Sequence, residues 1–186
     1  MVDLMAGTEA QDRNAWRVVL TRDVANLQRL LYESSPLPQL FTPCAVKLAR
    51  GGMPLPDENA IAYERLRLDE PQRERYNELL TQLAPGDGNA LEQLMGYPQL
   101  IQSTPPEIMC ERSARGEDPW TLPQMPSREF ESLAAAAAEW GLLLQLTSNG
   151  DADFEWGDAG HLYFCGHRAA MEQGDFSSVW VNYECH

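Results

Sequence analysis

Residues 127–150, SREFESLAAAAAEWGLLLQLTSNG, constrain the fold more than any other stretch of this sequence. Ser127 is a favourable N-cap, acidic residues follow in the first turn, and the alanine run has the highest helix propensity. Gly141 then predicts a left-handed stop. LLLQLTS predicts a buried strand, and Asn149-Gly150 is a strong signal for a tight turn. A long helix followed directly by a strand predicts an α+β fold.

Two strand–helix–strand patterns extend this prediction. HLYFCGH (161–167) and SVWVNYEC (178–185) predict strands on either side of a short helix. AWRVVL (15–20) and CAVKLA (44–49) predict strands on either side of a helix at 21–33. The repeated pattern predicts two small related mixed subdomains that pack as one compact domain.

The remaining segments set the predicted boundaries. Residues 69–83 predict a helix that begins at Asp69 or Glu70 before Pro71, and residues 89–95 predict a short helical turn. The expected organisation is a frayed N-terminus (1–14) and a single domain (15–186). The domain comprises subdomains at 15–102 and 127–186, joined by a Pro-rich loop at 103–126.

The charge is strongly acidic, with a net value of −14. The last 56 residues carry nine acidic side chains, and Arg168 is their one Lys or Arg. Such a surface repels nucleic acid and attracts basic partners, although an acidic surface also simply keeps a protein soluble. No apolar run is long enough for a membrane helix and no signal peptide is evident, so we expect a cytoplasmic protein with four free cysteines.

The stretch FEWGDAGHLYFCGH (154–167) gathers residue types that metal and nucleophilic sites use. A strand would place His161, Tyr163, Cys165 and His167 on one face, with His161 and Cys165 about 13 Å apart, too far for one zinc ion. Cys165 and His167 also lack a third orienting group. We therefore predict no metal, no cofactor and no catalytic residue, with Trp156, Leu162 and Phe164 in the core and a tight turn at Gly157 and Gly160.

Gln145 is a polar residue inside a predicted buried strand, so its amide must be hydrogen-bonded. It could bind a small ligand or hold a neighbouring loop in place. Tyr97, in a Gly-Tyr-Pro corner, and Gln102 could line the same pocket, although a Gly and a Pro this close together are ordinary turn chemistry. The alternative function that this predicts is a small-molecule-binding protein or weak enzyme with a pocket formed by Tyr97, Gln102 and Gln145.

An acidic set surrounds the predicted hairpin and consists of Asp151, Asp153, Glu155 and Asp158. The glycine and the twelfth-position glutamate of a calcium loop are missing, so we do not predict calcium binding. A solvated rim would explain the charges, and so would a docking surface for a cationic partner. Trp120 is of a residue type enriched at interfaces, and we include it among the predicted partner-binding residues.

Four segments together resemble the YwqG-like family, a group of bacterial cytosolic proteins built around a domain of unknown function. They are LEQLMGYPQLIQ, WGLLLQLTSN, WGDAGHLYF and FSSVWVNYEC, and they occur in the family's order. The resemblance covers about residues 15–186 and implies a shortened member without the family's N-terminal third. Cys165, Gly166 and Thr147 depart from the family pattern.

The family that the chain resembles carries no agreed enzymatic activity that could be transferred to it. Some members of the family look like neighbours of secreted toxins, including those delivered by type VI secretion, and would serve as immunity proteins. Together with the acidic C-terminal third, this predicts a non-enzymatic immunity protein. It would bind a cognate toxin with a basic surface, such as a secreted nuclease, and occlude the active-site cleft of that toxin.

Overall fold

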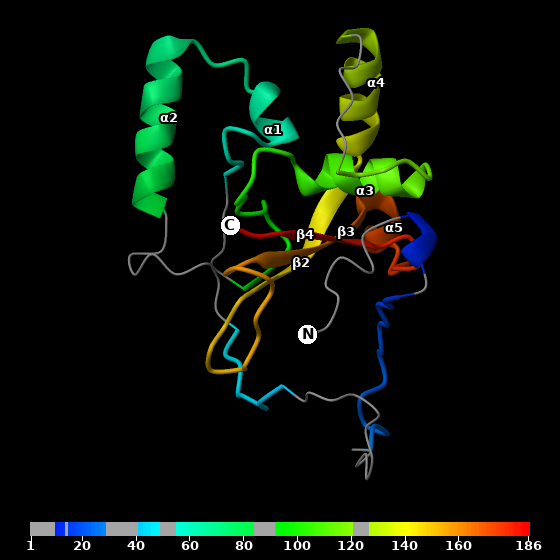
Figure 1. Cartoon of the computed structure of the whole chain (residues 1–186). Helices are drawn as coiled ribbons and strands as arrows, with labels where there is room; N and C mark the ends of the chain where they lie inside the picture. Colours follow the sequence, from blue (N-terminus) through cyan, green and yellow to red (C-terminus); the bar gives the residue numbers. More distant parts are fainter. Residues whose placement is uncertain (1–9, 14, 29–40, 49–54, 84–91, 121–126) are drawn as a thin grey trace.

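The computed structural model describes residues 10–13, 15–28, 41–48, 55–83, 92–120 and 127–186. A four-stranded antiparallel sheet lies at its centre in the order β1-β2-β3-β4, formed by Gln93–Leu94, Trp140–Thr147, His161–His167 and Trp180–Glu184 (Figure 1). The helices are η1 (Ala10–Asp12), α1 (Ile61–Glu64), α2 (Glu70–Leu83), α3 (Pro106–Ala114), α4 (Ser127–Ala137) and α5 (Arg168–Glu172). The predicted α+β class is confirmed.

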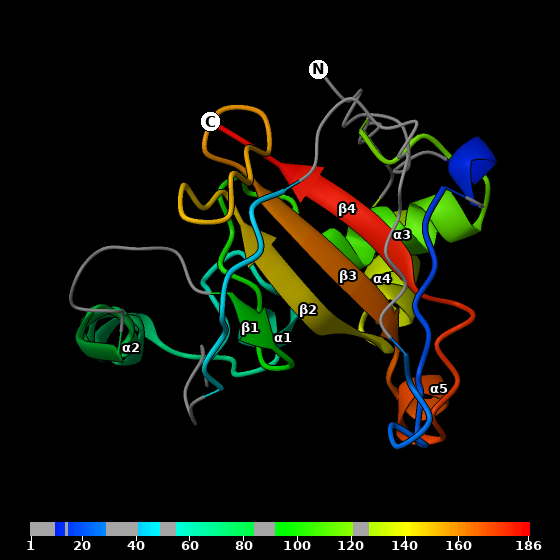
Figure 2. The same cartoon turned by 90° about the horizontal axis from the view of Figure 1, so that it is seen from below.

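The two faces of the sheet have different covers. Helix α3 packs across β2, β3 and β4 on one face, and α4 packs on α3. The segments 15–28 and 41–48 run below the opposite face without joining the sheet (Figure 2). The hydrophobic core of the described part of the protein therefore lies between α3 and this face of the sheet.

An irregularity in β2 decides which side chains reach the core. The pairing between β2 and β3 shifts between Leu142 and Leu144. Leu142 and Gln145, three residues apart, are consequently both buried on the α3 face. Leu142 lies opposite Cys165, and Gln145 lies opposite Tyr163.

The core combines a large apolar cluster with a row of buried polar residues. The apolar cluster comprises Cys110 of α3 and Trp140, Leu142, Tyr163, Cys165 and Trp180 of the sheet. A second cluster of Ile108, Leu133 and Ala137 joins α3 to α4. Gln145, His161, Asn182 and Glu184 are also buried, so the core contains polar groups that need partners.

The expectation that Leu162 and Phe164 lie in the core is wrong. The buried face of β3 is that of His161, Tyr163 and Cys165, whereas Leu162 and Phe164 are half-buried. Alternation along the strand was predicted correctly. Both faces carry large side chains, so the pattern alone does not identify the face that α3 covers.

Helix α3 is the largest difference from the sequence prediction, which assigned residues 103–126 to a loop. Pro105 is the N-cap of α3 and Pro106 occupies its first turn, where a missing N–H costs nothing. Seven of its nine residues are buried, including Glu107 and Arg112. A helix buried on all sides has no amphipathic stripe, so the prolines were the only visible signal. Residues 121–126 lie outside the described part.

The predicted strands at 15–20 and 44–49 are absent from the described residues 15–20 and 44–48. Val19 and Val46 have side chains 71% and 82% exposed. Their β-propensity has no effect here because a strand needs a neighbouring strand with which to pair. The predicted helix at 21–33 is absent from residues 21–28. Residues 29–33 of that helix and residue 49 of the predicted strand lie outside the described residues.

The helical turn predicted at 89–95 is also wrong over residues 92–95, the part of this stretch that the structure describes. Gln93–Leu94 form strand β1 and pair with Gln145 and Leu144, while residues 89–91 are not described. Met95 and Gly96 follow with φ values of 61° and 83°. The chain therefore turns a sharp corner at this point, as predicted for Gly96-Tyr97-Pro98.

Helices α2 and α4 confirm the corresponding predictions. Asp69 and Gln72 form a reciprocal cap at the start of α2, with N–H···O distances of 3.0 Å and 2.9 Å. Helix α4 ends before the predicted Gly141, which instead lies inside β2 at a φ that is not left-handed. The predicted cap by the Ser127 side chain lies outside the description.

The predicted subdomain boundary and frayed N-terminus can be compared with the structure in part. Strand β1 from the first predicted subdomain pairs with β2 from the second, so one sheet spans both. Residues 1–9 and 14 are not described, but Ala10–Asp12 form η1 and Arg13 binds the backbone of Val179. Among the described residues, no helix has the length and apolar character needed to cross a membrane.

Candidate functional site

The predicted acidic residues lie on the connection between β2 and β3. Asn149 and Phe154 pair through two backbone hydrogen bonds of 2.9 Å, which leaves a four-residue loop at 150–153. Asn149-Gly150 predicted a tight turn, but Gly150 is not left-handed, and Asp153 is instead, with φ of 56°. The carboxylates of Asp151, Asp153, Glu155 and Asp158 are all exposed.

An aromatic cluster supports this loop from below. Phe41 packs edge-on against Phe154 at 4.7 Å and against Trp156 at 5.7 Å between ring centroids. The N–H of Thr42 donates to the carbonyl of Ala152, and its hydroxyl donates to the carboxylate of Asp153. Phe41 and Thr42, which lie more than a hundred residues away in sequence, therefore restrict the conformations of the acidic loop.

A second turn completes the connection. The prediction of unusual backbone angles at Gly157 and Gly160 is confirmed for Gly157 alone. Gly157 has φ of 60°, as expected, and Ala159 shares this region with φ of 49°. Gly160 is not left-handed. A Cβ atom on Gly160 would lie 2.3 Å from the carbonyl oxygen of Trp156 and 2.4 Å from that of Glu184. Gly160 is therefore needed for close backbone approach.

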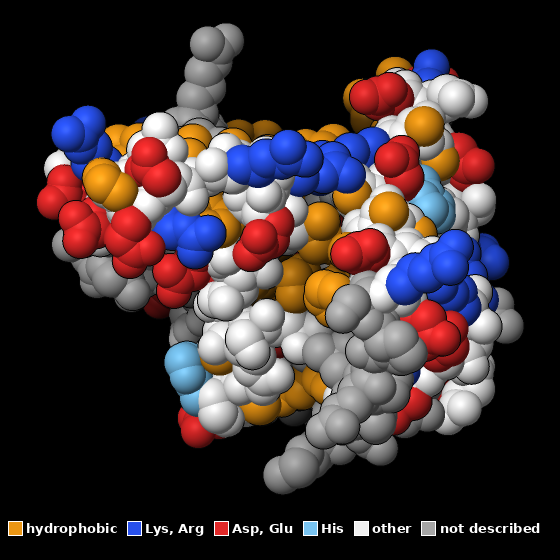
Figure 3. Space-filling view, turned by 90° about the horizontal axis from the view of Figure 1, so that it is seen from above, with side chains coloured by type: hydrophobic (Ala, Val, Ile, Leu, Met, Phe, Trp, Pro, Cys, Tyr) orange, Lys and Arg blue, Asp and Glu red, His pale blue; other side chains and the backbone are white. Residues whose placement is uncertain are grey.

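A fifth carboxylate lies beside the predicted set. The side-chain amide of Asn149 donates to Glu92 at 2.7 Å, and Glu92 is exposed. Glu92 precedes β1, and only the pairing of β1 with β2 reveals that it lies beside the loop. We call Glu92, Asp151, Asp153, Glu155 and Asp158 the acidic hairpin surface. The opposite end of the molecule shows acidic and basic side chains interspersed (Figure 3).

Trp120 does not join this surface. It follows α3 in the segment 117–120, which both Figure 1 and Figure 2 place apart from the β2–β3 connection. Its side chain is half-buried, and its indole N–H is buried without a partner in the structure. The predicted partner-binding residues thus form one group of carboxylates and one separate tryptophan.

Gln145 holds a neighbouring segment in place. Its amide oxygen accepts the N–H of Gln99 at 2.9 Å, and its amide nitrogen donates to the side chain of Gln99 at 3.3 Å. The carbonyl of Gln99 lies 2.7 Å from the Tyr163 hydroxyl and 3.2 Å from Nδ1 of His161. Three side chains of β2 and β3 therefore fix Gln99, which confirms the structural alternative for Gln145.

Glu184 fixes the next part of the same segment. One of its carboxylate oxygens accepts the N–H of Ile101 at 2.9 Å and that of Gln102 at 3.2 Å, and lies 3.0 Å from the Tyr163 hydroxyl. The other oxygen, Oε1, is buried without a partner. Burial raises the pKa of Glu184 above its usual value, despite the hydrogen bonds that lower it.

The neighbours of Glu184 have pKa shifts of the same origin. Burial, reinforced by the Glu184 carboxylate, raises the pKa of Tyr163, so its phenol stays protonated. Burial lowers the pKa of His161, so its imidazole is neutral around pH 7. This cluster can hold the 97–102 segment on the sheet, but its polar atoms are already used in doing so.

The alternative ligand pocket is not assembled as predicted. Gln145 is fully buried by Gln99, and the Gln102 side chain donates outward to the carbonyl of Cys185 at 3.0 Å. Tyr97 instead lines a different cavity, together with Glu107 and Arg168. The sequence prediction missed Glu107 and Arg168. Glu107 lies in a stretch predicted to be a loop, and nothing in the sequence indicates which residues lie near Arg168.

The two histidines and the cysteine of β3 are dispersed along the strand. All four cysteines are free, which confirms that prediction. A hydrogen bond with Cys110, together with burial, raises the pKa of Cys165, so its thiol is unreactive. His167 lies against the ring of Trp140 at 4.3 Å. Within the described ranges, no cluster of three or more such side chains could hold a metal ion.

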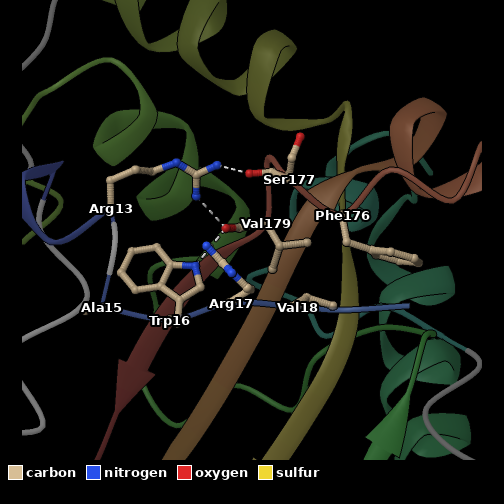
Figure 4. A pocket seen from close by; sticks show the side chains of 8 residues that line it. All are labelled: Arg13, Ala15, Trp16, Arg17, Val18, Phe176, Ser177 and Val179. Carbon is tan, nitrogen blue, oxygen red and sulfur yellow. Dashed lines mark hydrogen bonds between the residues drawn. The ribbon is translucent and has the colours of Figure 1, made fainter. Parts of the chain in front are cut away.

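A groove of about 500 Å³ lies between the N-terminal segment and the start of β4 (Figure 4). Trp16 donates from its indole to the carbonyl of Val179 at 2.8 Å, and its ring lies 5.0 Å from that of Trp180. Arg13 donates to the carbonyls of Val179 and Ser177. The hydrogen bonds drawn in Figure 4, from Arg13 and Trp16, thus attach the N-terminal segment to the residues that precede β4.

These features define a small α+β protein with an acidic connection exposed at one end of a four-stranded antiparallel sheet. The chain belongs to the family described as a domain of unknown function, DUF1963, whose model matches residues 2–185. A comparison with curated proteins found no match to this chain.

Proposed function

We propose that this chain is an immunity protein that acts in the cytoplasm without catalysing a reaction. It binds a cognate toxin with a basic active-site cleft, such as a secreted nuclease, and occludes that cleft. The observation that carries the proposal is the acidic hairpin surface, which presents carboxylates on a loop held in a single shape.

The geometry of this surface suits electrostatic recognition. Because the loop is fixed by Phe41 and Thr42, its carboxylates lose little conformational freedom when a partner binds. From residue 131 to the C-terminus the one Lys or Arg is Arg168, at the start of α5, so cations do not neutralise this end of the chain. Complementary charge speeds association and sets the register of a complex.

The family resemblance supports the same proposal. The segments LEQLMGYPQLIQ, WGLLLQLTSN, WGDAGHLYF and FSSVWVNYEC resemble the YwqG-like family, some members of which look like neighbours of toxins. Several of these residues fix the fold, including Gln99 and Gln145. Of the residues that we propose for toxin binding, Asp151, Asp153 and Glu155 lie between two of these segments, whereas Glu92 and Asp158 lie inside them.

Capture followed by growth rescue tests this function. The tagged chain is used to isolate binding proteins from lysate of the native cell, and each captured protein is then expressed in a susceptible host. We expect one captured protein to stop growth and co-expression of this chain to restore growth. If none of the captured proteins is toxic, or if co-expression does not restore growth, the proposal is wrong.

Reversing charges on the acidic hairpin surface should slow association with the captured toxin. In Asp151→Lys/Glu155→Lys/Asp158→Lys, we expect the association rate constant to fall about tenfold at low salt, because steering by opposite charge is lost. The salt dependence of that rate should decrease at the same time. Asp153 is retained, because it has a left-handed φ and accepts a hydrogen bond from Thr42. Stopped-flow or surface-based kinetics measures both effects.

A matched reversal separates local from overall charge. Glu74→Lys/Glu78→Lys/Glu131→Lys changes the net charge equally, on exposed positions of α2 and α4. We expect this variant to associate at a rate within about twofold of the native rate. Equal slowing in the two triple variants would show that the hairpin is not the contact surface.

A further inference from the structure

A small cavity lies on the α3 side of the sheet, away from the acidic hairpin surface. It has a volume of about 180 Å³ and is bounded by α1, by the end of α4, by the start of β2 and by the start of α5. Figure 1 shows these elements grouped around α3. Apolar walls come from Ala60, Ile61, Ala62, Ala137, Ala138 and Trp140.

A buried carboxylate lines this cavity. Glu107 of α3 is 6% exposed, and its Oε2 atom is buried without a hydrogen-bond partner in the structure. Burial raises the pKa of Glu107, although its own backbone N–H and the charge of Arg168 act in the opposite direction. Buried acceptors in folded proteins normally have donors, so this oxygen is available to accept a hydrogen bond from a bound group.

Two arginines bring positive charge to the same cavity. Arg65 follows α1 and Arg168 begins α5, and both side chains are otherwise exposed. Among the described residues, no ion pair within 4.0 Å joins either arginine to Glu107. A guanidinium group binds a carboxylate through two parallel hydrogen bonds, so these residues offer a site for an anionic group.

Gly141 positions one of these guanidinium groups. A Cβ atom at residue 141 would lie 2.7 Å from both Cζ and Nη1 of Arg168. The guanidinium group therefore lies directly over the backbone of β2, in space that any side chain at position 141 would fill. This is a reason for glycine inside the strand, where the sequence predicted a helix stop.

We propose that this cavity binds a small zwitterion of amino-acid size, with its ammonium group at Glu107 and its carboxylate at Arg168 and Arg65. The ammonium supplies the donor that Oε2 of Glu107 lacks. The volume is below the roughly 300–1,000 Å³ of pockets for drug-sized ligands, and so favours a compact molecule. Nucleotides and other polyanions fit poorly, because a buried carboxylate repels them. This site is independent of the proposed toxin interface.

Calorimetry and thermal denaturation of the full chain with free amino acids test this proposal. The panel is glycine, L-alanine, L-serine and β-alanine at constant ionic strength. Acetate, which has only the carboxylate, and ethylamine, which has only the ammonium group, serve as half-ligands for comparison. We expect at least one zwitterion to bind and raise the melting temperature, and each half-ligand to bind at least tenfold more weakly. If no zwitterion in the panel binds with a dissociation constant below about 10 mM, the proposal is wrong. It is also wrong if acetate or ethylamine binds as tightly as the best zwitterion.

Two variants remove the proposed contacts from opposite sides. Glu107→Gln removes the negative charge, and Gly141→Ala displaces only the mobile end of the Arg168 side chain. We expect each to weaken zwitterion binding at least tenfold, while circular dichroism shows a folded protein. Glu172→Gln and Gly150→Ala are the matched controls, because residue 172 is exposed and a Cβ at residue 150 meets no atom within 4 Å. Unchanged affinity in either cavity variant would overturn the assignment.

Discussion

Glu184→Ala is expected to lower the free energy of unfolding by about 3 kcal/mol, because it leaves buried donors without an acceptor and opens a cavity. The N–H groups of Ile101 and Gln102 both donate to this carboxylate, and the Tyr163 hydroxyl lies 3.0 Å from it. Urea denaturation at pH 7 measures the change. Native-like stability of the alanine variant would show that Glu184 does not anchor the 97–102 segment.

Glu184→Gln is the matched control, because it keeps an oxygen acceptor of the same shape and removes the charge. We expect its stability at pH 7 to lie within about 1 kcal/mol of the native value. The native carboxyl has a folded-state pKa above its ordinary value of 4.5, since burial disfavours the charged form. The folded state then binds more protons than the unfolded state above about pH 4.5, so the contribution of Glu184 to stability decreases as pH rises through this range.

The Glu184→Gln variant should lack the contribution that titration of Glu184 makes to the pH dependence of stability. The stability of Glu184→Gln relative to the native protein should therefore be more favourable at pH 7 than at pH 4. Glu107 also has a pKa raised by burial and, to a smaller extent, by the Glu184 charge, so it adds a similar trend to both proteins. Taking the difference between the two proteins removes most of it. A difference that stays constant with pH would show that Glu184 titrates normally.

Gly160→Ala should destabilise the protein by about 3 kcal/mol, because the added methyl group overlaps atoms that cannot move away. Its nearest neighbours are the backbone carbonyl oxygens of Trp156 and Glu184, at 2.3 Å and 2.4 Å. For a chain of 186 residues this corresponds to a fall of roughly 6–12 °C in the melting temperature. Differential scanning calorimetry measures both quantities.

Gly150→Ala in the same connection provides the comparison for this substitution. Its φ is not left-handed, and nothing lies within 4 Å of the added Cβ. We expect a change of less than about 0.5 kcal/mol, or a slight gain from the less flexible unfolded chain. If both alanine variants lost equal stability, close packing at Gly160 would not be the cause.

Local signals in the sequence predicted α2, α4, β2, β3 and β4. Asp69 and Gln72 are three residues apart, so the reciprocal cap of α2 is visible without any tertiary information. The predicted burial of Gln145 also required a hydrogen-bond partner for its amide, and the structure shows that this partner is the neighbouring segment at Gln99. The exposed acidic set around 151–158 followed from composition and turn signals alone.

Long-range packing decided the rest, because it depends on residues that local patterns cannot bring together. Valines at 15–20 and 44–48 have high β-propensity, but no strand pairs with them in the described structure. Helix α3 is buried on nearly every side, so it shows no amphipathic period, and its sequence predicts a loop. Glu92 belongs to the acidic hairpin surface only through the pairing of β1 with β2.

The sequence by itself therefore determined the α+β class, the helices with visible caps, the alternating strands and the concentration of negative charge near the C-terminus. Tertiary structure alone decided which face of β3 is buried, and it placed Glu107, Arg65 and Arg168 around one cavity. The physical reason is that capping and alternation act between residues a few positions apart. Burial and pairing depend on surfaces that meet only after the chain has folded.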